Sequence, residues 1–209
     1  LVTFNLPFLK SQVKTLLFKQ KDAFDTFLYL KDVQNRNNRT FLYFFNVGNY
    51  SRFDKNLPST NKAFIELIKY ISSYADVGLH PSYYSNENPD FFKIEKEKLT
   101  SITGKEITKS RQHFLKLRLP DTYRQLISIG IKEDYSMGYA SEPGFRAGTC
   151  TPFYWFDLQT NKSTELKVFP ITYMEGTLGE DLGLGPNEAL HLIKNITDEV
   201  KKYNSFHIS

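Results

Sequence analysis

The sequence predicts an α/β domain in which a mostly parallel sheet is covered by helices. Segments with strand patterns alternate along the 209 residues with segments of helical period, which is the order that the crossover connections of a parallel sheet require. Some of the strand segments are apolar on both faces, as the strands of a covered parallel sheet are. The glycine-rich stretch 176–185 is interpreted as a loop, and no other linker or repeat divides the chain. We therefore expect a single domain over residues 1–209.

The expected strands are short runs without a helical period. The first consists almost wholly of aromatic and β-branched residues, and the second (DVGLH) ends at Pro81, which cannot donate to a strand ladder. The others lie between turn signals. We expect strands at residues 41–47, 76–80, 110–116, 131–136 and 166–170, and the start of one more at 205–208.

The expected helices carry apolar side chains three and four residues apart. Ser59 or Thr60 is placed to cap the third helix. Gly104 and Gly130 follow two others in the position where helices commonly end, and Pro186 stands in the first turn of the last. We expect helices at residues 9–19, 22–33, 60–74, 90–102, 121–129 and 186–203.

Composition and charge exclude several classes of protein. Hydrophobic residues make up 40% of the chain and charged residues 24%, a balance that excludes intrinsic disorder and coiled coil. No apolar stretch reaches the length of about 18 residues that a membrane span needs. The net charge of +4 is spread along the chain, and the basic run Lys93–Lys109 is interleaved with glutamates, so we expect no nucleic-acid partner. A single cysteine, Cys150, and the lack of a visible signal peptide predict a cytoplasmic protein.

Uncommon polar residues follow the expected strands, and ligand sites of parallel sheets form at the carboxyl ends of their strands. His80, His113, Asp134 and Arg146 all lie in such positions. Two imidazoles and a carboxylate at adjacent strand ends would form an open zinc site; the alternative is that each histidine is a structural residue of the core. On an alternating strand, Arg111 and His113 would point to the same face, where a buried pair needs an anionic partner.

Three longer segments stand in order along the chain: GLHPSYYS, SRQHFLKLRLPDTYRQLISIGIKEDYSMGY and GFRAGTCTPFYWFDL. Together they resemble the polysaccharide deacetylase family of the NodB-homology type, in the subgroup common in bacterial surface-polysaccharide gene clusters, from about Asp22 to Tyr203. The resemblance implies a distorted (β/α) barrel of mostly parallel strands. It also implies a hydrolase that removes N-acetyl groups from an amino-sugar-containing polysaccharide or its precursor, with a divalent metal, expected to be zinc, held by one aspartate and two histidines.

The resemblance implies the metal ligands residue by residue. His80, in the run Gly78–Ser82, matches the first metal histidine. The better-known deacetylases place the second histidine at the position where this chain has Tyr84. His113 in the RQHF motif is the substitute that the resemblance favours, so His80 and His113 are the expected metal ligands.

The resemblance also implies the remaining site residues. Arg146 in GFRAG is similar to the arginine that orients the catalytic carboxylate, with Arg111 as the alternative. Asp134 lies where an aspartate from a neighbouring strand supports the site. Aromatic side chains are expected to contact the carbohydrate, namely Tyr83, Tyr84 and Trp155.

The two ends of the sequence depart from the family pattern. The family opens with a strand that carries an aspartate pair, whereas this chain has Asn5 and Leu6 where carboxylates would be expected. The last residues, SFHIS, resemble the start of the strand that carries the family's last histidine motif. We therefore expect the domain to lack its first and last strands, and these 209 residues by themselves to lack turnover. The alternative function is a non-catalytic carbohydrate-binding relative of the same fold.

Overall fold

The computed structural model describes residues 10, 13–17, 20–22 and 24–203. The chain forms two compact units, Leu1–Phe41 and Leu42–Ser209. The helix expected at residues 9–19 lies partly outside the described residues, and the strand expected at 205–208 lies wholly outside them. Among the described residues, no helix combines the length and the apolar character that crossing a bilayer requires.

The first unit contains helix α2, Phe27–Arg36. The helix begins later than the expected 22–33 because the Asp22 carboxylate accepts a hydrogen bond from the Phe24 amide at 2.9 Å, which favours a turn before the helix. Gln34 is buried, and its side-chain oxygen accepts from the amide of Phe41 at 3.0 Å.

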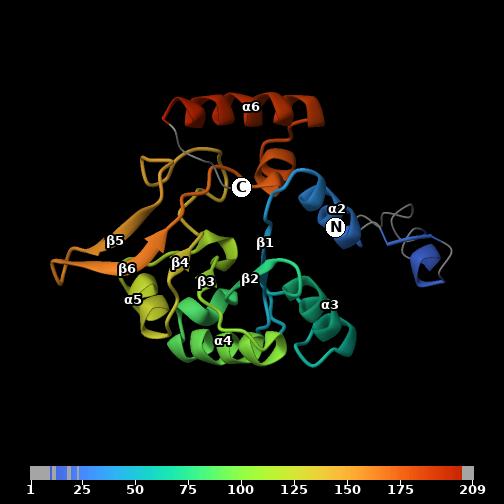
Figure 1. Ribbon diagram of the computed structural model, residues 1–209, viewed down its shortest axis with the longest axis horizontal. Helices are drawn as coiled ribbons and strands as arrows, with labels where there is room; N and C mark the ends of the chain where they lie inside the picture. The colour runs from blue at the N-terminus through green and yellow to red at the C-terminus, as the bar shows by residue number, and fades with distance from the viewer. Residues whose placement is uncertain (1–9, 11–12, 18–19, 23, 204–209) are drawn as a thin grey trace. The chain divides into compact units, whose positions relative to one another are not determined.

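The second unit contains a six-stranded sheet in the order β1-β2-β3-β4-β6-β5 (Figure 1). Every pairing is parallel except the hairpin of β5 with β6, so the predicted mostly parallel α/β architecture is confirmed. Among the described residues, β1 and β5 are the edge strands. The strands are β1 Leu42–Phe45, β2 Asp76–Leu79, β3 Lys109–Ser110, β4 Glu133–Asp134, β5 Phe153–Asp157 and β6 Lys162–Val168.

Helices α3, α4 and α5 lie along one side of the sheet (Figure 1). The side chains that face them stand in one row across the parallel strands, because the register pairs Phe45, Leu79, Ser110, Asp134 and Val168 in turn. All five residues are buried. Side chains of α4 and α5 pack against Val168, at the last position of the row, to form the core. The helices are α3 Lys62–Ser72, α4 Pro89–Thr103, α5 Asp121–Ser128 and α6 Pro186–Lys202.

Local signals place the helix ends close to the predicted positions. Gly104 and Gly130 both adopt positive φ, +68° and +79°, directly after or near the ends of α4 and α5. The cap of α3 is Asn61 rather than Ser59 or Thr60, because its side chain accepts from the Phe64 amide at 3.1 Å.

Two lysines of the basic run after Lys93 donate to carbonyls at the ends of helices. The Lys96 ammonium donates to the Ile129 carbonyl at 2.5 Å, just after α5 ends, and the Lys105 ammonium donates to the Ser72 carbonyl at the end of α3. Cations near the C-termini of helices satisfy their last carbonyls and complement the helix dipole.

Two strand predictions need correction. The expected strand 110–116 is wrong beyond Ser110, because His113–Leu115 forms a 3-10 turn in which Phe114 and Leu115 adopt positive φ of 57° and 49°. Arg111 and His113 are therefore not on alternating positions of one strand. The expected strand 166–170 begins earlier, at Lys162, because it pairs with the unpredicted strand β5 in a hairpin.

Candidate functional site

His80 directly follows β2 and continues its pairing with β1. Its backbone amide donates to the Phe45 carbonyl at 2.9 Å, and Pro81 comes next. The ring Nδ1 lies 2.6 Å from the Arg111 carbonyl oxygen. Because a carbonyl oxygen can only accept, Nδ1 carries the proton and Nε2 is left for a ligand.

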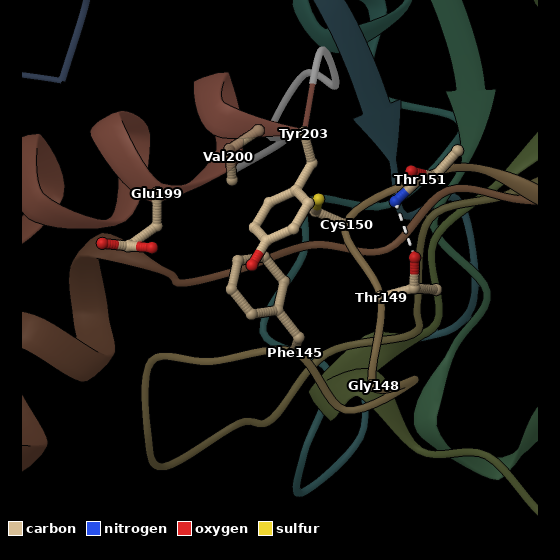
Figure 2. A pocket seen from close by; sticks show the side chains of 8 residues that line it. All are labelled: Phe145, Gly148, Thr149, Cys150, Thr151, Glu199, Val200 and Tyr203. Atoms are coloured by element: carbon tan, nitrogen blue, oxygen red, sulfur yellow. Dashed lines mark hydrogen bonds between the residues drawn. The ribbon is translucent and has the colours of Figure 1, made fainter.

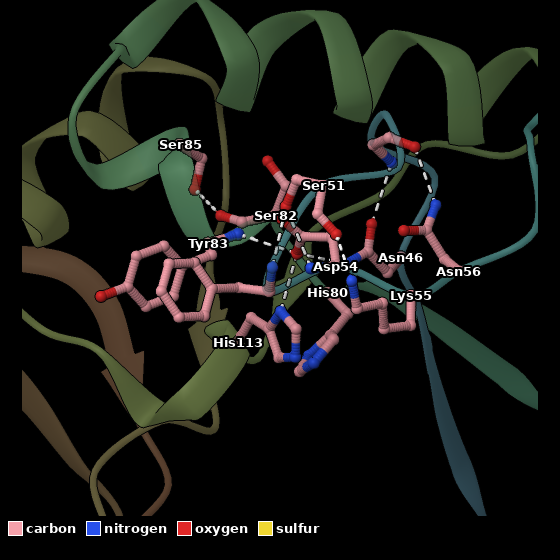
Figure 3. Close-up of polar contacts among 12 residues, drawn as sticks. Asn46, Ser51, Asp54, Lys55, Asn56, His80, Ser82, Tyr83, Ser85 and His113 are labelled. Atoms are coloured by element: carbon pink, nitrogen blue, oxygen red, sulfur yellow. Dashed lines mark hydrogen bonds and ion pairs between the residues drawn. The ribbon is translucent and has the colours of Figure 1, made fainter. Parts of the chain in front are cut away.

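His113 comes from the short turn after β3, the strand next to β2. The turn is tied to β4, because the Gln112 amide donates to the Ser136 hydroxyl at 2.8 Å and that hydroxyl donates to Asp134 at 2.7 Å. The His113 Nδ1 lies 2.7 Å from the Asp54 carboxylate. The rings of His80 and His113 are 4.9 Å apart between centroids, so the predicted approach of these two side chains is confirmed (Figure 3).

Asp54 lies in the loop after β1 and is fully buried. Besides His113, its carboxylate accepts from the Asn46 amide at 3.0 Å, the Ser51 hydroxyl at 2.7 Å and the Tyr83 backbone amide at 3.0 Å (Figure 3). Burial alone would raise the pKa of Asp54, but these hydrogen bonds outweigh it and hold the pKa below the ordinary value of 3.8. The carboxylate is therefore ionised at neutral pH and fixes the His113 tautomer with Nδ1 protonated.

The loops after three adjacent parallel strands thus supply the site. Asp54 follows β1, His80 follows β2 and His113 follows β3, and all three come together at the carboxyl ends of those strands. The sequence did not single out Asp54 as the partner of His113. The available signal was its place in a polar loop directly after a buried strand.

The electrostatic surroundings keep His80 neutral. Burial, followed by the charges of His113 and Arg111, lowers the pKa of His80 from 6.5 to about 4. A neutral imidazole with its Nδ1 proton engaged can bind a metal ion or accept a proton at Nε2. Within the part of the chain that the structure describes, no group of three or more His, Cys, Asp or Glu side chains is arranged to hold a metal ion.

Asp134 lies on the helix-facing side of the sheet, at the end of β4. It accepts from the Tyr123 hydroxyl at 3.1 Å and from the Ser136 amide at 3.0 Å, in addition to the Ser136 hydroxyl. Complete burial raises the pKa of Asp134 from 3.8 to about 6. Its link to the histidines is indirect and passes through Ser136 and Gln112 to the His113 turn.

The two candidate arginines are both connected to the His113 turn: Arg111 precedes it in the chain, and Arg146 contacts its last residue. The Arg146 guanidinium donates to the carbonyls of Leu115 at 3.2 Å and Gly138 at 3.3 Å, which ties its loop to the end of the His113 turn. Arg111 holds His80 through its backbone carbonyl. Burial lowers the pKa of the Arg111 guanidinium, and the opposing charges of Glu175 and Asp134 counteract the shift.

The predicted substrate-binding aromatics separate into two places. Tyr83 and Tyr84 form a short turn, η1 (Tyr83–Asn86), beside the histidines, and both rings contact Phe53. Tyr84 also lines a cavity of about 170 Å³ that Asp54 borders. Trp155, by contrast, packs against the hydrophobic core from β5, with its ring centroid 5.4 Å from that of Tyr123.

Cys150 borders a separate cavity of about 400 Å³ between the loop before β5 and the end of α6 (Figure 2). Among the residues that line it, Glu199 is the one with a carboxylate, and none carries an imidazole, ammonium or guanidinium group that would activate a thiol. The lining residues are Phe145, Gly148, Thr149, Cys150, Thr151, Glu199, Val200 and Tyr203.

No protein-family model matches the chain, and no curated protein matches it significantly.

Proposed function

We propose that this protein is a metal-dependent hydrolase that removes N-acetyl groups from an amino-sugar-containing polysaccharide or its precursor. The observation that carries the proposal is the pair His80 and His113. Their rings lie 4.9 Å apart at the carboxyl ends of neighbouring parallel strands, and each Nδ1 is engaged by a fixed acceptor, which leaves both Nε2 atoms for one ligand.

The histidine pair fits a zinc ion by the chemistry of its donors. Metal-ligating histidines almost always donate their other ring N–H to a carboxylate or a backbone carbonyl, and His113 and His80 each have one of these partners. Imidazole suits zinc, and catalytic zinc takes three protein ligands. His80 and His113 would supply two of these three ligands. Zinc bound there would polarise the acetyl carbonyl and lower the pKa of a bound water.

The remaining site residues position this pair. Asp54 holds the His113 ring in one tautomer and keeps a negative charge behind it. Asp134, through Ser136, holds the turn that carries His113. We assign to Arg146 the orientation of the catalytic carboxylate, since its guanidinium is tied to the same turn, with Arg111 as the alternative residue.

The strand order also supports a distorted (β/α) barrel. Strands β1 to β4 follow one another across the sheet in chain order, as the strands of a (β/α) barrel do. A doubly wound sheet would instead reverse its order at a switch point. The helices α3, α4 and α5 along one side of the sheet agree with such a barrel (Figure 1).

The proposal is tested by zinc binding and by acetate release. Zinc affinity of the full-length protein is measured by competition with a chromophoric chelator, for the wild type and for His80→Ala, His113→Ala and the control His191→Ala. His191 is exposed on α6, so its variant should bind zinc like the wild type, whereas the other two should lose the site. Acetate release from N-acetylglucosamine oligomers should require zinc and stop with chelator.

The outcomes separate the two functions. Wild-type zinc affinity in both His80→Ala and His113→Ala would refute the metal site. Zinc binding without acetate release from any amino sugar, together with sugar binding, would favour the non-catalytic carbohydrate-binding alternative.

A further inference from the structure

We propose that Phe114 is the platform on which a pyranose ring of the carbohydrate stacks beside the histidine pair. The inference rests on the proposed function, because it takes the ligand to be a sugar. Its evidence is independent of the metal, since it comes from the exposure, the ring contacts and the backbone of Phe114.

The Phe114 ring lies next to the site and faces solvent. Its centroid is 4.5 Å from that of His113, and the two rings are tilted by only 33°. The rings of Tyr83 and Phe53 stand nearly perpendicular to it, at 5.6 and 6.2 Å. Despite these neighbours, Phe114 is 54% exposed. An exposed aromatic ring beside a candidate reaction centre can bind the apolar C–H face of a sugar.

Tyr83, one of the three aromatic residues expected to contact sugar, is half-buried. Phe53 lies 4.1 Å from its ring centroid at an interplanar angle of 30°, and the Lys116 ammonium lies 3.9 Å over the same ring. Both groups lie close against the Tyr83 ring and limit the room left for a sugar there. Tyr83 therefore supports the cluster, and Phe114 presents the accessible ring.

The backbone of Phe114 is strained, and the burial of its own side chain does not explain the strain. Phe114 (φ 57°, ψ 18°) and Leu115 (φ 49°) both occupy the left-handed region, which non-glycine residues seldom adopt. The side chain of Leu115 is only 4% exposed, so its burial offsets the cost of its own positive φ. The turn is held by hydrogen bonds from the Leu115 amide to Gln112, from the Lys116 amide to His113 and from Arg146 to Leu115. Strain held in place around an exposed ring is typical of functional positions.

The surroundings specify the class of ligand. A pyranose ring offers an apolar C–H face for the phenyl ring and hydroxyl groups for polar partners. The Tyr83 ring that contacts Phe114 carries the Lys116 ammonium over it, and this ammonium pairs with Glu87 at 3.0 Å. These two charged groups can receive the hydroxyl groups. Because Phe114 and His113 are in ring contact, a sugar stacked on Phe114 places its substituents beside the histidine pair. The platform would thus position the sugar that carries the N-acetyl group or the one adjacent to it.

The test measures carbohydrate binding without metal. The full-length protein, kept in chelator, is titrated calorimetrically with the N-acetylglucosamine tetramer and, in parallel, with the glucosamine and glucose tetramers. Phe114→Ala should weaken binding about tenfold or more, as truncation of a central aromatic contact does. Phe114→Trp should retain binding. Phe156→Ala is the matched control, because Phe156 is also exposed, at 44%, but lies on β5.

A further variant separates binding from structure. Phe114→Gly places the residue that tolerates positive φ at this position, so its melting temperature should equal or exceed that of the wild type while sugar binding is lost. In Phe114→Trp combined with Trp155→Phe, tryptophan emission reports on position 114 alone, since Trp155 is the one tryptophan of the chain. This emission should change when the tetramer binds.

The proposal is overturned if Phe114→Ala and the wild type bind the same tetramer equally, or if the wild type binds none of the three at millimolar concentration. It is also overturned if Phe114→Gly lowers the melting temperature and keeps its sugar affinity. If the protein fails to bind zinc but still binds sugar through Phe114, the proposed hydrolase is refuted and the role of Phe114 is supported. If zinc binding and acetate release are intact and Phe114→Ala has the same KM as the wild type, the role of Phe114 is refuted and the proposed hydrolase is supported.

Discussion

Replacing Asp54 by Asn tests whether this buried carboxylate supports a metal histidine. One carboxylate oxygen, Oδ1, accepts from Asn46, Tyr83 and His113, and the other accepts from Ser51. An asparagine can keep its oxygen toward the first three donors and direct its amide toward the Ser51 hydroxyl. The fold should therefore survive, but the hydrogen bonds to a charged acceptor become neutral ones. On this basis we expect a loss of about 1–2 kcal/mol in the free energy of unfolding.

The effect on zinc should be larger than the effect on stability suggests. Loss of the partner of a metal histidine typically lowers metal affinity by about 10- to 100-fold, and Asp54→Asn should show a decrease of this size in chelator competition. Asp157→Asn is the control, because Asp157 is also buried but pairs with Arg124 at 2.7 Å on another part of the sheet. It should lose stability and keep its zinc affinity. Equal zinc affinity of Asp54→Asn and the wild type would refute the assigned role.

The acid dependence of stability gives a second readout of Asp54→Asn. Because the pKa of Asp54 is held below 3.8 in the folded protein, its contribution to stability is present at neutral pH. That contribution is lost as the pH falls below 3.8 through the folded pKa. Denaturant titrations of both proteins from pH 7 to about pH 3 should therefore converge on the acid side. A constant difference between them at every pH would contradict this account.

Three further predictions concern other buried positions. Asp134 has a folded pKa raised to about 6 from 3.8, so its contribution to stability is fully present below 3.8 and is lost as the pH rises through about 6. This contribution is about 3 kcal/mol at most. Because the lowered pKa of His80 acts in the opposite direction over the same range, the measurement is the difference in unfolding free energy between the wild type and Asp134→Asn, which should shift against the wild type from about pH 4 to about pH 7. Gly78→Ala should destabilise the protein by about 1–3 kcal/mol, because a Cβ there would lie 2.5 Å from the Phe44 ring and 3.0 Å from the Lys109 carbonyl; an unchanged melting temperature would show that the sheet adjusts freely. Cys150→Ser should leave acetate release unchanged, since no imidazole or cationic group that would activate a thiol lines its cavity, and a loss of more than about tenfold would require a role for the thiol.

The sequence predicted the helices well because their signals are local. The ends of α4 and α5 follow from Gly104 and Gly130, which are within one or two residues of the last helical turn. The first turn of α6 follows from Pro186 in the same way. Strand β5 was missed because FYWFD is short and its alternation becomes informative only when the hairpin partner β6 is known. The barrel stays a proposal, since the strand order agrees with it without showing closure.

The candidate site illustrates the same division between local and tertiary information. By itself, the sequence determined that His80 ends a strand, because strand length and the proline after His80 are local properties. It wrongly placed His113 within the next strand. Only the tertiary structure decided that His113 leaves the sheet in a strained turn and that its partner is Asp54, 59 residues away. The physical reason is that a hydrogen bond between loops depends on where the ends of β1, β2 and β3 meet in space. The identity of that partner is set by sheet register and loop packing, which no single stretch of the chain encodes.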